Sequence, residues 1–414
     1  MRKVYERCCG IDVHKNILAV CLICGESQEV REFKTNTRDL RELSSWLISS
    51  ECQMIAMEST GSYWKPLYNI FELSGLDVIV VNAGHVKNVP GRKTDVNDAE
   101  WLADLLSHGL LNASYIPSRE QRELREVSRY RLSLIQERAR ELNRLQKMLE
   151  GANIKLSSVT SDINGVSSRR VLQAIIDGKA PSSEEVSKLL HVSMHDKLDD
   201  IMSAIDGYIS PVQKELLSSV ISHIDDMAAR ILKMDDLIMW NIEGYEAAIE
   251  RLDGVPGIGR RSAETILAET GTDMSRFPTS GHLCRWSGVA PGNNESAGKR
   301  KSGRTTKGNS TLKKALVQCA MAAVKKKSTF FYAQYQRIAV RRGKRRALLA
   351  VAHSILIAIY NMLKNNEAYK ELGADYYNQF NQQRKINMHL KKLKDLGWKP
   401  APQILITGAA AEQA

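Results

Sequence analysis

The sequence lacks the marks of a secreted, a membrane-spanning or a P-loop protein. Its seven cysteines are an odd number at irregular spacing, which argues against a secreted disulfide framework. The first residues, MRKVYERCCG, contain no apolar signal-peptide core, and no P-loop motif occurs. Residues 347–363 are the most apolar stretch, but they are too short for a membrane span and include His353. We therefore expect a cytoplasmic protein with no membrane partner, in which this stretch is a buried helix.

Positive charge is in excess and is concentrated in one region of the chain. The 59 Lys and Arg residues outnumber the 47 Asp and Glu residues, which gives a formal net charge of +12. From residue 299 onward the basic runs KRKSGR, KK, KKK and RRGKRR follow one another, the last of them beginning at residue 341. One such run is as often a solvated surface as a binding site, but several in one region favour a polyanionic partner, because neutralised phosphates release counterions. The composition therefore predicts a protein that binds nucleic acid.

The order of strand and helix signals predicts an α/β domain followed by mostly helical structure. Over residues 4–115, strand-like runs alternate with helical stretches, beginning with two strands at 4–13 and 17–24. A first hairpin that carries an acid, followed by strand–helix–strand units, is the order of RNase H and RuvC-like domains. The 414 residues are enough for two or three domains.

A long helical arm is predicted in the middle of the chain. Residues 120–150 have apolar side chains three or four apart, and residues 156–188, rich in Ser and Gly, interrupt the helix until about His195. Beyond that point, two apolar rows recur every seven residues, which is typical of a coiled-coil seam. The rows are Leu217, Ile224, Ile231 and Ile238, and Val220, Met227 and Met234. They predict an intramolecular helical hairpin with residues 120–150, dimerisation through the arm, or both.

Residues 252–271, LDGVPGIGRRSAETILAETG, have the pattern of a helix–hairpin–helix element. Gly257 and Gly259 permit close backbone approach, and the amides at the start of the next helix can bind a phosphate. Together with Arg260 they are a candidate site for the DNA backbone. The alternative is a plain turn between two helices.

Four carboxylates are candidate metal ligands. Asp12 ends a strand-like run, Glu58 ends the apolar run MIAME, and Asp95 and Asp98 lie three residues apart on one face of a helix. Clustered oxygen ligands suit Mg²⁺ (or Mn²⁺), and two such ions about 3.5–4 Å apart can activate both oxygens of a phosphoryl displacement. Each acid also has a structural explanation, as a turn residue or a helix cap. Their order along the chain favours the metal site.

A basic loop at residues 291–310 contains three candidate nucleophiles, Ser296, Ser302 and Ser310. A serine can attack phosphorus when a base or a metal takes its proton and cations stabilise the transition state. Chemistry alone does not choose among the three, and a loop that only holds phosphate is the alternative. The basic residues expected to contact nucleic acid, here and in the run at 341–345, are Lys299, Arg300, Lys301, Arg304, Arg341, Arg342, Lys344 and Arg345.

Five segments together give a specific resemblance to a known family. They are GIDVHKN, MESTGSYW, KTDVNDAEWLADLL, PGIG with AETILAE, and GVAPGNNESAGKRKSG. With them the sequence resembles the DEDD transposases of the insertion sequence 110 family, which are relatives of the Piv DNA invertases. The resemblance covers about residues 4–105 and 250–360, and the helical arm agrees in type only.

The resemblance implies a RuvC-like domain whose metal-binding quartet is Asp12, Glu58, Asp95 and Asp98, and a transposase domain whose catalytic serine is Ser296. In such prokaryotic enzymes the serine attacks DNA, forms a phosphoserine link, and strands are exchanged. A covalent link retains the bond energy, so the missing P-loop is consistent with this reaction. The implied partners are target and donor DNA, a non-coding bridge RNA that pairs with both, and further copies of the chain. The copies form a dimer and a tetrameric synapse in which acids of one subunit meet the serine of another.

Four domains are predicted along the chain. They are a RuvC-like catalytic domain at residues 1–118, a coiled-coil arm with a Ser/Gly-rich insertion at 119–250, a transposase domain with the helix–hairpin–helix and the serine loop at 251–372, and a tail at 373–414. Two other functions stay open on the residues alone. One is a RuvC-like, metal-dependent Holliday-junction nuclease without a covalent intermediate, and the other is a non-catalytic nucleic-acid scaffold whose acids only cap helices.

Overall fold

The chain forms two compact units. The computed structural model describes residues 3–59, 61–82, 86, 98–178, 181–292, 294–296, 299–302, 304, 305 and 307–398. One unit comprises Met1–Pro117 and the other Ser118–Ala414. The sequence predicts an α/β fold for the N-terminal region and a mostly helical C-terminal region, and both predictions are confirmed.

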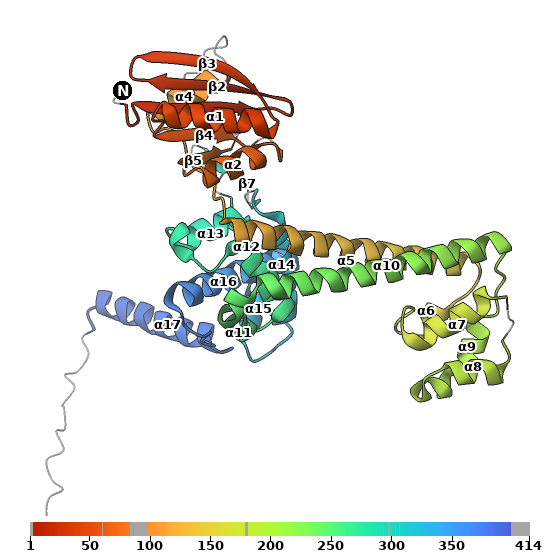
Figure 1. The fold of residues 1–414 in the computed structure, drawn as a ribbon. Coiled ribbons are helices and arrows are strands. Elements are labelled where there is room, and N and C mark those ends of the chain that lie inside the picture. Colours follow the sequence, from red (N-terminus) through yellow and green to blue (C-terminus); the bar gives the residue numbers. More distant parts are fainter. Residues whose placement is uncertain are drawn as a thin grey trace, which may run out of the picture. The chain divides into compact units, whose positions relative to one another are not determined.

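A five-stranded mixed sheet forms the centre of the N-terminal unit (Figure 1). Its strands are β1 (Arg7–Val13), β2 (Ile17–Cys24), β3 (Ser27–Lys34), β4 (Met54–Glu58) and β5 (Val78–Val81). They lie in the order β3-β2-β1-β4-β5, with antiparallel pairing among the first three and parallel pairing from β1 to β4 and β5. The sequence pattern does not predict β3, because nearly all residues of this edge strand are exposed and no apolar alternation marks it.

Helices cover both faces of the sheet. The helices α1 (Thr37–Ser49) and α2 (Trp64–Leu73) share a core with Cys9 and Ile11 of β1. On the other face, α4 (Asp98–Ser107) packs with Cys8 of β1 and Ala56 of β4. Because side chains alternate along a strand, the even-numbered residues of β1 and β4 face α4.

The close packing of α4 on the sheet depends on Gly10. A Cβ atom at this position would lie 2.9 Å from the Cα of Ala103, and closer still to the backbone oxygen of Ala99 and the backbone nitrogen of Ala103. These are backbone atoms, so no rotation of a side chain relieves the clash. A larger residue at position 10 therefore forces α4 away from β1.

We expect Gly10→Ala to destabilise the N-terminal unit by about 1–3 kcal/mol, the usual cost of overpacking a well-packed core. Hydrogen exchange of the backbone amides in β1 and α4 measures this loss. Gly151→Ala is the control, because a Cβ at Gly151 meets nothing within 4 Å. Equal protection in the two variants would contradict the direct contact between α4 and β1.

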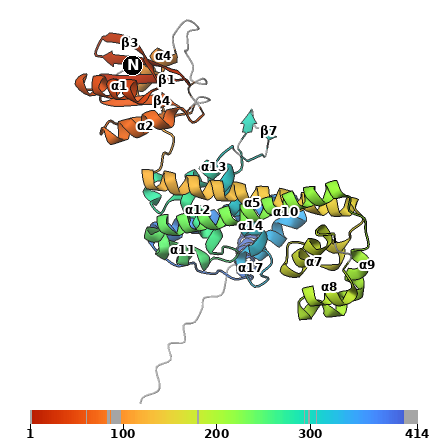
Figure 2. The ribbon, with the colours of Figure 1, turned by 45° about the vertical axis from the view of Figure 1, so that its right-hand side comes forward.

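Two long helices lie side by side as an arm in the C-terminal unit (Figures 1 and 2). They are α5 (Arg119–Gly151) and α10 (Pro211–Asn241). Leu217, Val220 and Ile224 of α10 share a buried cluster with Leu145 and Leu149 of α5. The intramolecular pairing of the two helical segments is therefore confirmed, whereas a coiled-coil seam stays a prediction.

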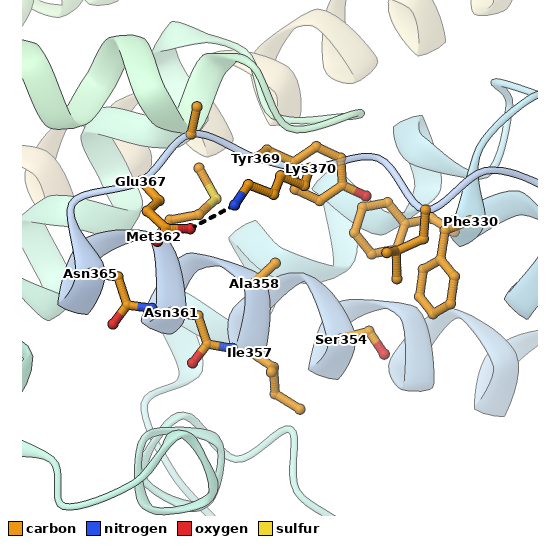
Figure 3. A pocket seen from close by; sticks show the side chains of 13 residues that line it. Phe330, Ser354, Ile357, Ala358, Asn361, Met362, Asn365, Glu367, Tyr369 and Lys370 are labelled. Atoms are coloured by element: carbon orange, nitrogen blue, oxygen red, sulfur yellow. Dashed lines mark hydrogen bonds and ion pairs between the residues drawn. The ribbon is translucent and has the colours of Figure 1, made fainter. Parts of the chain in front are cut away.

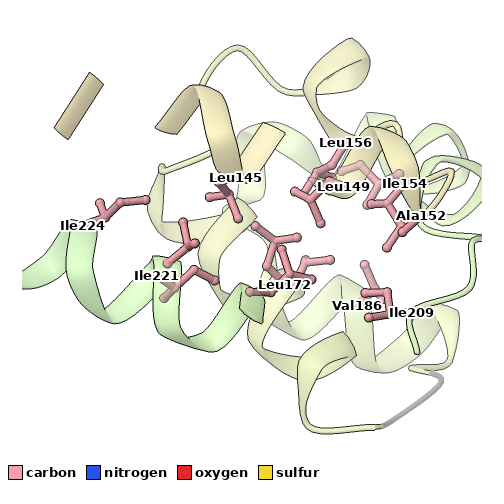
Figure 4. Close-up of a cluster of buried hydrophobic side chains, with 14 of the residues drawn as sticks. Leu145, Leu149, Ala152, Ile154, Leu156, Leu172, Val186, Ile209, Ile221 and Ile224 are labelled. Atoms are coloured by element: carbon pink, nitrogen blue, oxygen red, sulfur yellow. The ribbon is translucent and has the colours of Figure 1, made fainter. Parts of the chain in front are cut away.

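Short helices fill the connection between α5 and α10. They are α6 (Leu156–Val159), α7 (Val166–Ile176), α8 (Ser183–Leu189), the 3₁₀ turn η1 (Val192–Lys197) and α9 (Leu198–Ala204). Leu172 and Val186 extend the core of the arm into these helices (Figure 4). The expectation that helix resumes only near His195 was wrong, because the many Ser residues conceal a sparse apolar pattern in α7 and α8.

The rest of the C-terminal unit, as far as the structure describes it, is a helical core with a β-hairpin. Its elements are η2 (Glu243–Tyr245), α11 (Glu246–Asp253), α12 (Arg260–Thr270), η3 (Met274–Arg276), α13 (Ser280–Ser287), β6 (Asn294–Ser296), β7 (Lys299–Ser302), α14 (Ser310–Ala323), α15 (Phe330–Arg342), α16 (Lys344–Asn365) and α17 (Tyr376–Asp395). By length and composition α16 would be able to cross a membrane, with 44% of its most apolar window buried. It packs against α13, α14 and α15, as the prediction of a core helix at 347–363 requires.

Candidate catalytic and nucleic-acid-binding sites

Asp12 and Glu58 lie next to each other on adjacent parallel strands. β1 and β4 pair in register from Cys8 with Met54 to Ile11 with Met57, and the same offset places Asp12 beside Glu58. Both acids are on the face of the sheet that α4 covers. The side chain of Asp12 is 12% exposed, and its Oδ2 lies 3.0 Å from Nε2 of His14. The two carboxylates thus share one end of one sheet face.

The helix α4 runs back along β1 and begins near these acids. The contacts that show this direction are Val4 with Ser107, Cys8 with Ala103, and Gly10 with Ala99. As β1 proceeds, its contacts move toward the N-terminal end of α4. The next inward-facing residue of β1, Asp12, therefore lies toward the end of α4 that starts with Asp98. Burial raises the pKa of Cys8 to about 11, so its thiol stays protonated and donates to the carbonyl of Ala103.

Two of the four predicted metal ligands, Asp12 and Glu58, therefore share one end of one face. The helix that begins with Asp98 starts toward the same end, and Asp95 lies outside the described residues. Among the residues that the structure describes, His, Cys, Asp and Glu side chains form no group of three that would hold a metal ion. The donor set is nonetheless composed of carboxylate oxygens alone. Such donors suit Mg²⁺ or Mn²⁺, whereas thiolates would favour zinc.

Ser296 lies at the tip of the β-hairpin in the C-terminal unit. β6 and β7 are antiparallel, and Ser296 pairs with Lys299 across a two-residue connection. Ser302 pairs with Asn294 at the open end of the hairpin, and Ser310 begins α14. Of the three candidate nucleophiles, Ser296 is thus the one in the last described strand pair before the closed end of the hairpin. The side chains of residues 294–296 and 299–302, including the predicted contacts Lys299, Arg300 and Lys301, lie outside the described part of the chain.

A buried ion-pair cluster joins the base of this hairpin to the arm. Glu269 of α12 has a side chain only 1% exposed, and it accepts hydrogen bonds from Arg129 of α5 at 2.7 and 2.8 Å. Arg125 approaches the same carboxylate at 3.3 Å. Nδ2 of Asn309 donates to Glu269 at 2.6 Å, while Oδ1 of Asn309 caps α14. No local sequence pattern predicts this cluster, because Arg125 and Glu269 alone lie 144 residues apart.

The turn between α11 and α12 packs against α14. Gly257 has a φ of 88°, and a Cβ there would lie 2.8 Å from the Cα of Ala323, so both backbone and space require glycine. Gly259 caps α12 with open space around it. The guanidinium of Arg260 donates to Glu246 at 2.6 and 3.1 Å, which lowers the pKa of that carboxyl group. Arg260 is therefore engaged within the protein, and the helix–hairpin–helix role of this turn stays a prediction.

Four predicted nucleic-acid contacts gather at the corner between α15 and α16. Gly343, with a φ of 84°, turns the chain between the two helices. The flanking cations Arg341, Arg342, Lys344 and Arg345 are all exposed. Within the described part of the chain, none of these four makes an ion pair, so their charge is available to a polyanion. Arg304, near the base of the serine hairpin, is also exposed.

An apolar cavity of about 370 Å³ lies between α16 and the segment that follows it (Figure 3). Phe330, Ile357 and Tyr369 line it, and burial raises the pKa of the Tyr369 hydroxyl. Its two charged residues, Glu367 and Lys370, pair with each other at 3.1 Å. The cavity thus offers neither free cations nor clustered carboxylates, and it is not a candidate for phosphoryl chemistry.

Comparison with known proteins gives matches over both units. A family model described as a transposase, of the DEDD type in IS110, matches residues 9–154, and one described as "Transposase IS116/IS110/IS902 family" matches residues 249–336. A probable family 20 transposase from Pseudomonas aeruginosa is 26% identical over 320 residues, which are 76% of this chain and 80% of the relative. An uncharacterized 43.6 kDa protein of insertion element IS110 from Streptomyces coelicolor is 26% identical over 310 residues, 68% of this chain and 73% of the relative. A transposase for insertion sequence element IS1533 from Leptospira borgpetersenii is 28% identical over 165 residues, 38% of this chain and 47% of the relative.

The chain has an α/β unit with carboxylates at the end of its sheet and a helical unit with a basic hairpin. Transposase models match both units, which defines the chain as an enzyme that acts on DNA. The two models together span more than half of the sequence. The chain belongs to the IS110 family of transposases, and it is the transposase of an insertion sequence.

Proposed function

We propose that this transposase cuts and rejoins DNA through a phosphoserine intermediate on Ser296, with Mg²⁺ (or Mn²⁺) held by carboxylates of the N-terminal unit. The observation that carries the proposal is the register of β1 and β4, which sets Asp12 beside Glu58 on the face where α4 begins with Asp98. The strand order β3-β2-β1-β4-β5, with acids on β1 and at the end of β4, supports a RuvC/RNase H-like domain at residues 1–118.

The carboxylates of Asp12, Glu58, Asp95 and Asp98 would hold the ion. When bound, a divalent ion supplies Lewis-acid polarisation of a phosphoryl oxygen. The chain provides the setting for this. Asp12 is largely buried and contacts His14, which fixes its carboxylate, and the tight contact at Gly10 holds α4 and its first residue against the sheet.

Ser296 would carry the covalent step. Its Oγ forms a bond to phosphorus while one phosphorus–oxygen bond of the DNA breaks, and the serine proton ends on the departing DNA oxygen through solvent. The products are a phosphoserine diester and a free DNA hydroxyl, and the hydroxyl of an exchanged strand reverses the step without ATP. Lys299, which pairs with Ser296 in the hairpin, belongs to a cationic strand that lowers the cost of charge on the phosphate.

The partners in this proposal are target and donor DNA, a bridge RNA and further copies of the chain. The exposed cations at the corner of α15 and α16 support contact with a polyanion. In this proposal residues 119–250 are the helical arm and residues 251–372 the transposase domain, with α11 and α12 as the helix–hairpin–helix. Leu232, Met239 and Trp240 of α10 are 64%, 54% and 78% exposed, which supports dimerisation through the arm.

The experiment that tests the proposal traps the intermediate and maps its position. The protein and its copurifying RNA are incubated with Mg²⁺ and with labelled DNA that carries the ends of the element. The mixture is then denatured, and the covalent adduct is digested with trypsin. Mass spectrometry should find a nucleotide on the peptide that contains Ser296. A nucleotide on another residue would refute the assignment, and cleavage that leaves only free ends would identify a junction nuclease instead.

A further inference from the structure

A basic groove of about 830 Å³ lies between α5, α12 and α14 of the C-terminal unit. We name it the arm groove. Its charged lining residues are Arg129 and Arg131 of α5, Arg261 of α12, and Lys313 and Lys314 of α14. Among the residues that the structure describes, no carboxylate lines it. We infer that the arm groove binds the phosphate backbone of DNA beside the serine hairpin.

Buried carboxylates behind the groove hold its arginines in place. Glu269, Asp235 and Glu264 are only 1%, 8% and 4% exposed, so they orient the guanidinium groups without occupying the groove. Arg129 spends two of its five N–H donors on Glu269, and its side chain remains 48% exposed. Arg261 donates to Asp235 at 2.8 Å and remains 51% exposed. Both arginines therefore retain donors for a second anion, in a geometry fixed by the first.

The two lysines add charge that no described carboxylate balances. Lys313 is half-buried and donates to Oγ1 of Thr305 at 2.7 Å, which leaves two of its three ammonium donors. Lys314 is exposed and makes no ion pair within the described part of the chain. Cations placed side by side repel one another, and a polyanion in the groove relieves this repulsion.

The lining indicates a phosphodiester backbone as the occupant. A groove of this volume is far larger than one phosphate ion, and its cations come from three helices. Its neutral polar residues are hydroxyls and amides, such as Ser262, Thr311 and Gln318, which hydrogen-bond to phosphate oxygens. Among the residues that the structure describes, no aromatic side chain on which a base would stack lines the groove, so its contacts are of the kind made with the backbone.

The position of the groove identifies the backbone as that of DNA. Lys313 binds Thr305, and Thr305 pairs with Pro291 at the base of the hairpin that ends in Ser296. The buried Glu269 links the same base to Arg129 of the groove through Asn309. A strand that delivers a phosphate to Ser296 thus has the arm groove beside it. The choice of DNA as occupant rests on the proposed function, while the anion site itself does not.

The test measures DNA binding against salt concentration in the double variant Lys313→Gln/Lys314→Gln. Both proteins carry Ser296→Ala, so that only equilibrium binding is observed. We expect the slope of log K against log salt for duplex DNA to fall by about 1.8, since each lost phosphate contact removes roughly 0.9. The change should be the same for element ends and for unrelated DNA. The control, Lys147→Gln/Lys233→Gln, removes two exposed arm charges outside the groove and should keep the parent slope.

Three outcomes would overturn the inference. One is an unchanged slope in a variant whose unfolding midpoint equals that of the parent protein. Another is an equal decrease in the control variant, and the third is a decrease confined to duplex RNA of the same sequence, which would assign the groove to RNA. A failure of the phosphoserine proposal would be distinguishable from a failure of this inference. It would appear as a covalent adduct in the Ser296→Ala protein, and it would leave the salt dependence of DNA binding unchanged.

Discussion

Ser296→Ala is expected to abolish the covalent protein–DNA adduct and to lower strand rejoining by at least about 10³-fold. Without the hydroxyl, no phosphorus–oxygen bond to the protein forms, and the direct attack of water leaves free ends that do not conserve the bond for rejoining. The adduct is measured on denaturing gels after incubation with element DNA, RNA and Mg²⁺, and rejoining is measured by sequencing the recombinant junctions.

The matched control for this variant is Ser302→Ala. Ser302 belongs to the same hairpin but pairs with Asn294 at its open end, so the substitution removes the same hydroxyl from the same loop without changing its tip. We expect Ser302→Ala to keep the adduct and most of the rejoining, and both variants to bind DNA as the parent protein does. An adduct that persists in Ser296→Ala, or disappears equally in Ser302→Ala, would contradict the role of Ser296.

The positions of Asp12 and Glu58 near the ends of their strands were predictable, because the sequence marks both strands as apolar runs. Asp12 is the last residue but one of β1 and Glu58 is the last of β4, and the ends of neighbouring parallel strands meet at one edge of a sheet. The register that makes Asp12 and Glu58 neighbours was not predictable, since it depends on side chains of three layers packing together. The direct contact of α4 with Gly10 was not predictable for the same reason, because the local sequence GID does not indicate that a helix packs against this glycine.

The sequence gives no sign of the arm groove. Its basic residues are spread over α5, α12 and α14, and the most conspicuous basic runs of the chain lie elsewhere. Arg129 reads as an ordinary exposed residue of a helix, and Glu269 as part of an amphipathic pattern. Only the fold shows that the two are bonded across 140 residues and that the pair lies beside Asn309. Long-range charge pairing of this kind has no periodicity, so periodic analysis does not detect it.

Asp12→Asn and Glu58→Gln are expected to reduce single-turnover DNA cleavage by about 10³-fold or more each. Each substitution removes a charge from the oxygen donors that hold the divalent ion, and such an ion contributes several kcal/mol of transition-state stabilisation. Mn²⁺ affinity, measured by titration calorimetry, should fall in the same variants. The affinity for DNA should be unchanged or slightly higher, because a carboxylate that repels phosphate has been removed.

Asp104→Asn is the control that separates metal binding from the general loss of a charge. Asp104 belongs to α4, as Asp98 does, but its side chain is 55% exposed and lies 3.4 Å from His108 at the far end of the helix. Its removal should leave cleavage and Mn²⁺ affinity intact. If Asp12→Asn and Glu58→Gln also cleave at the parent rate, the acids only cap and turn the chain, and the protein holds nucleic acid without cutting it through this site. If Asp12→Asn and Glu58→Gln lose cleavage while Asp104→Asn retains it, the loss is specific to the acids at the end of the sheet face, because each of the three variants removes one charge. The metal site is then at the end where β1, β4 and α4 converge.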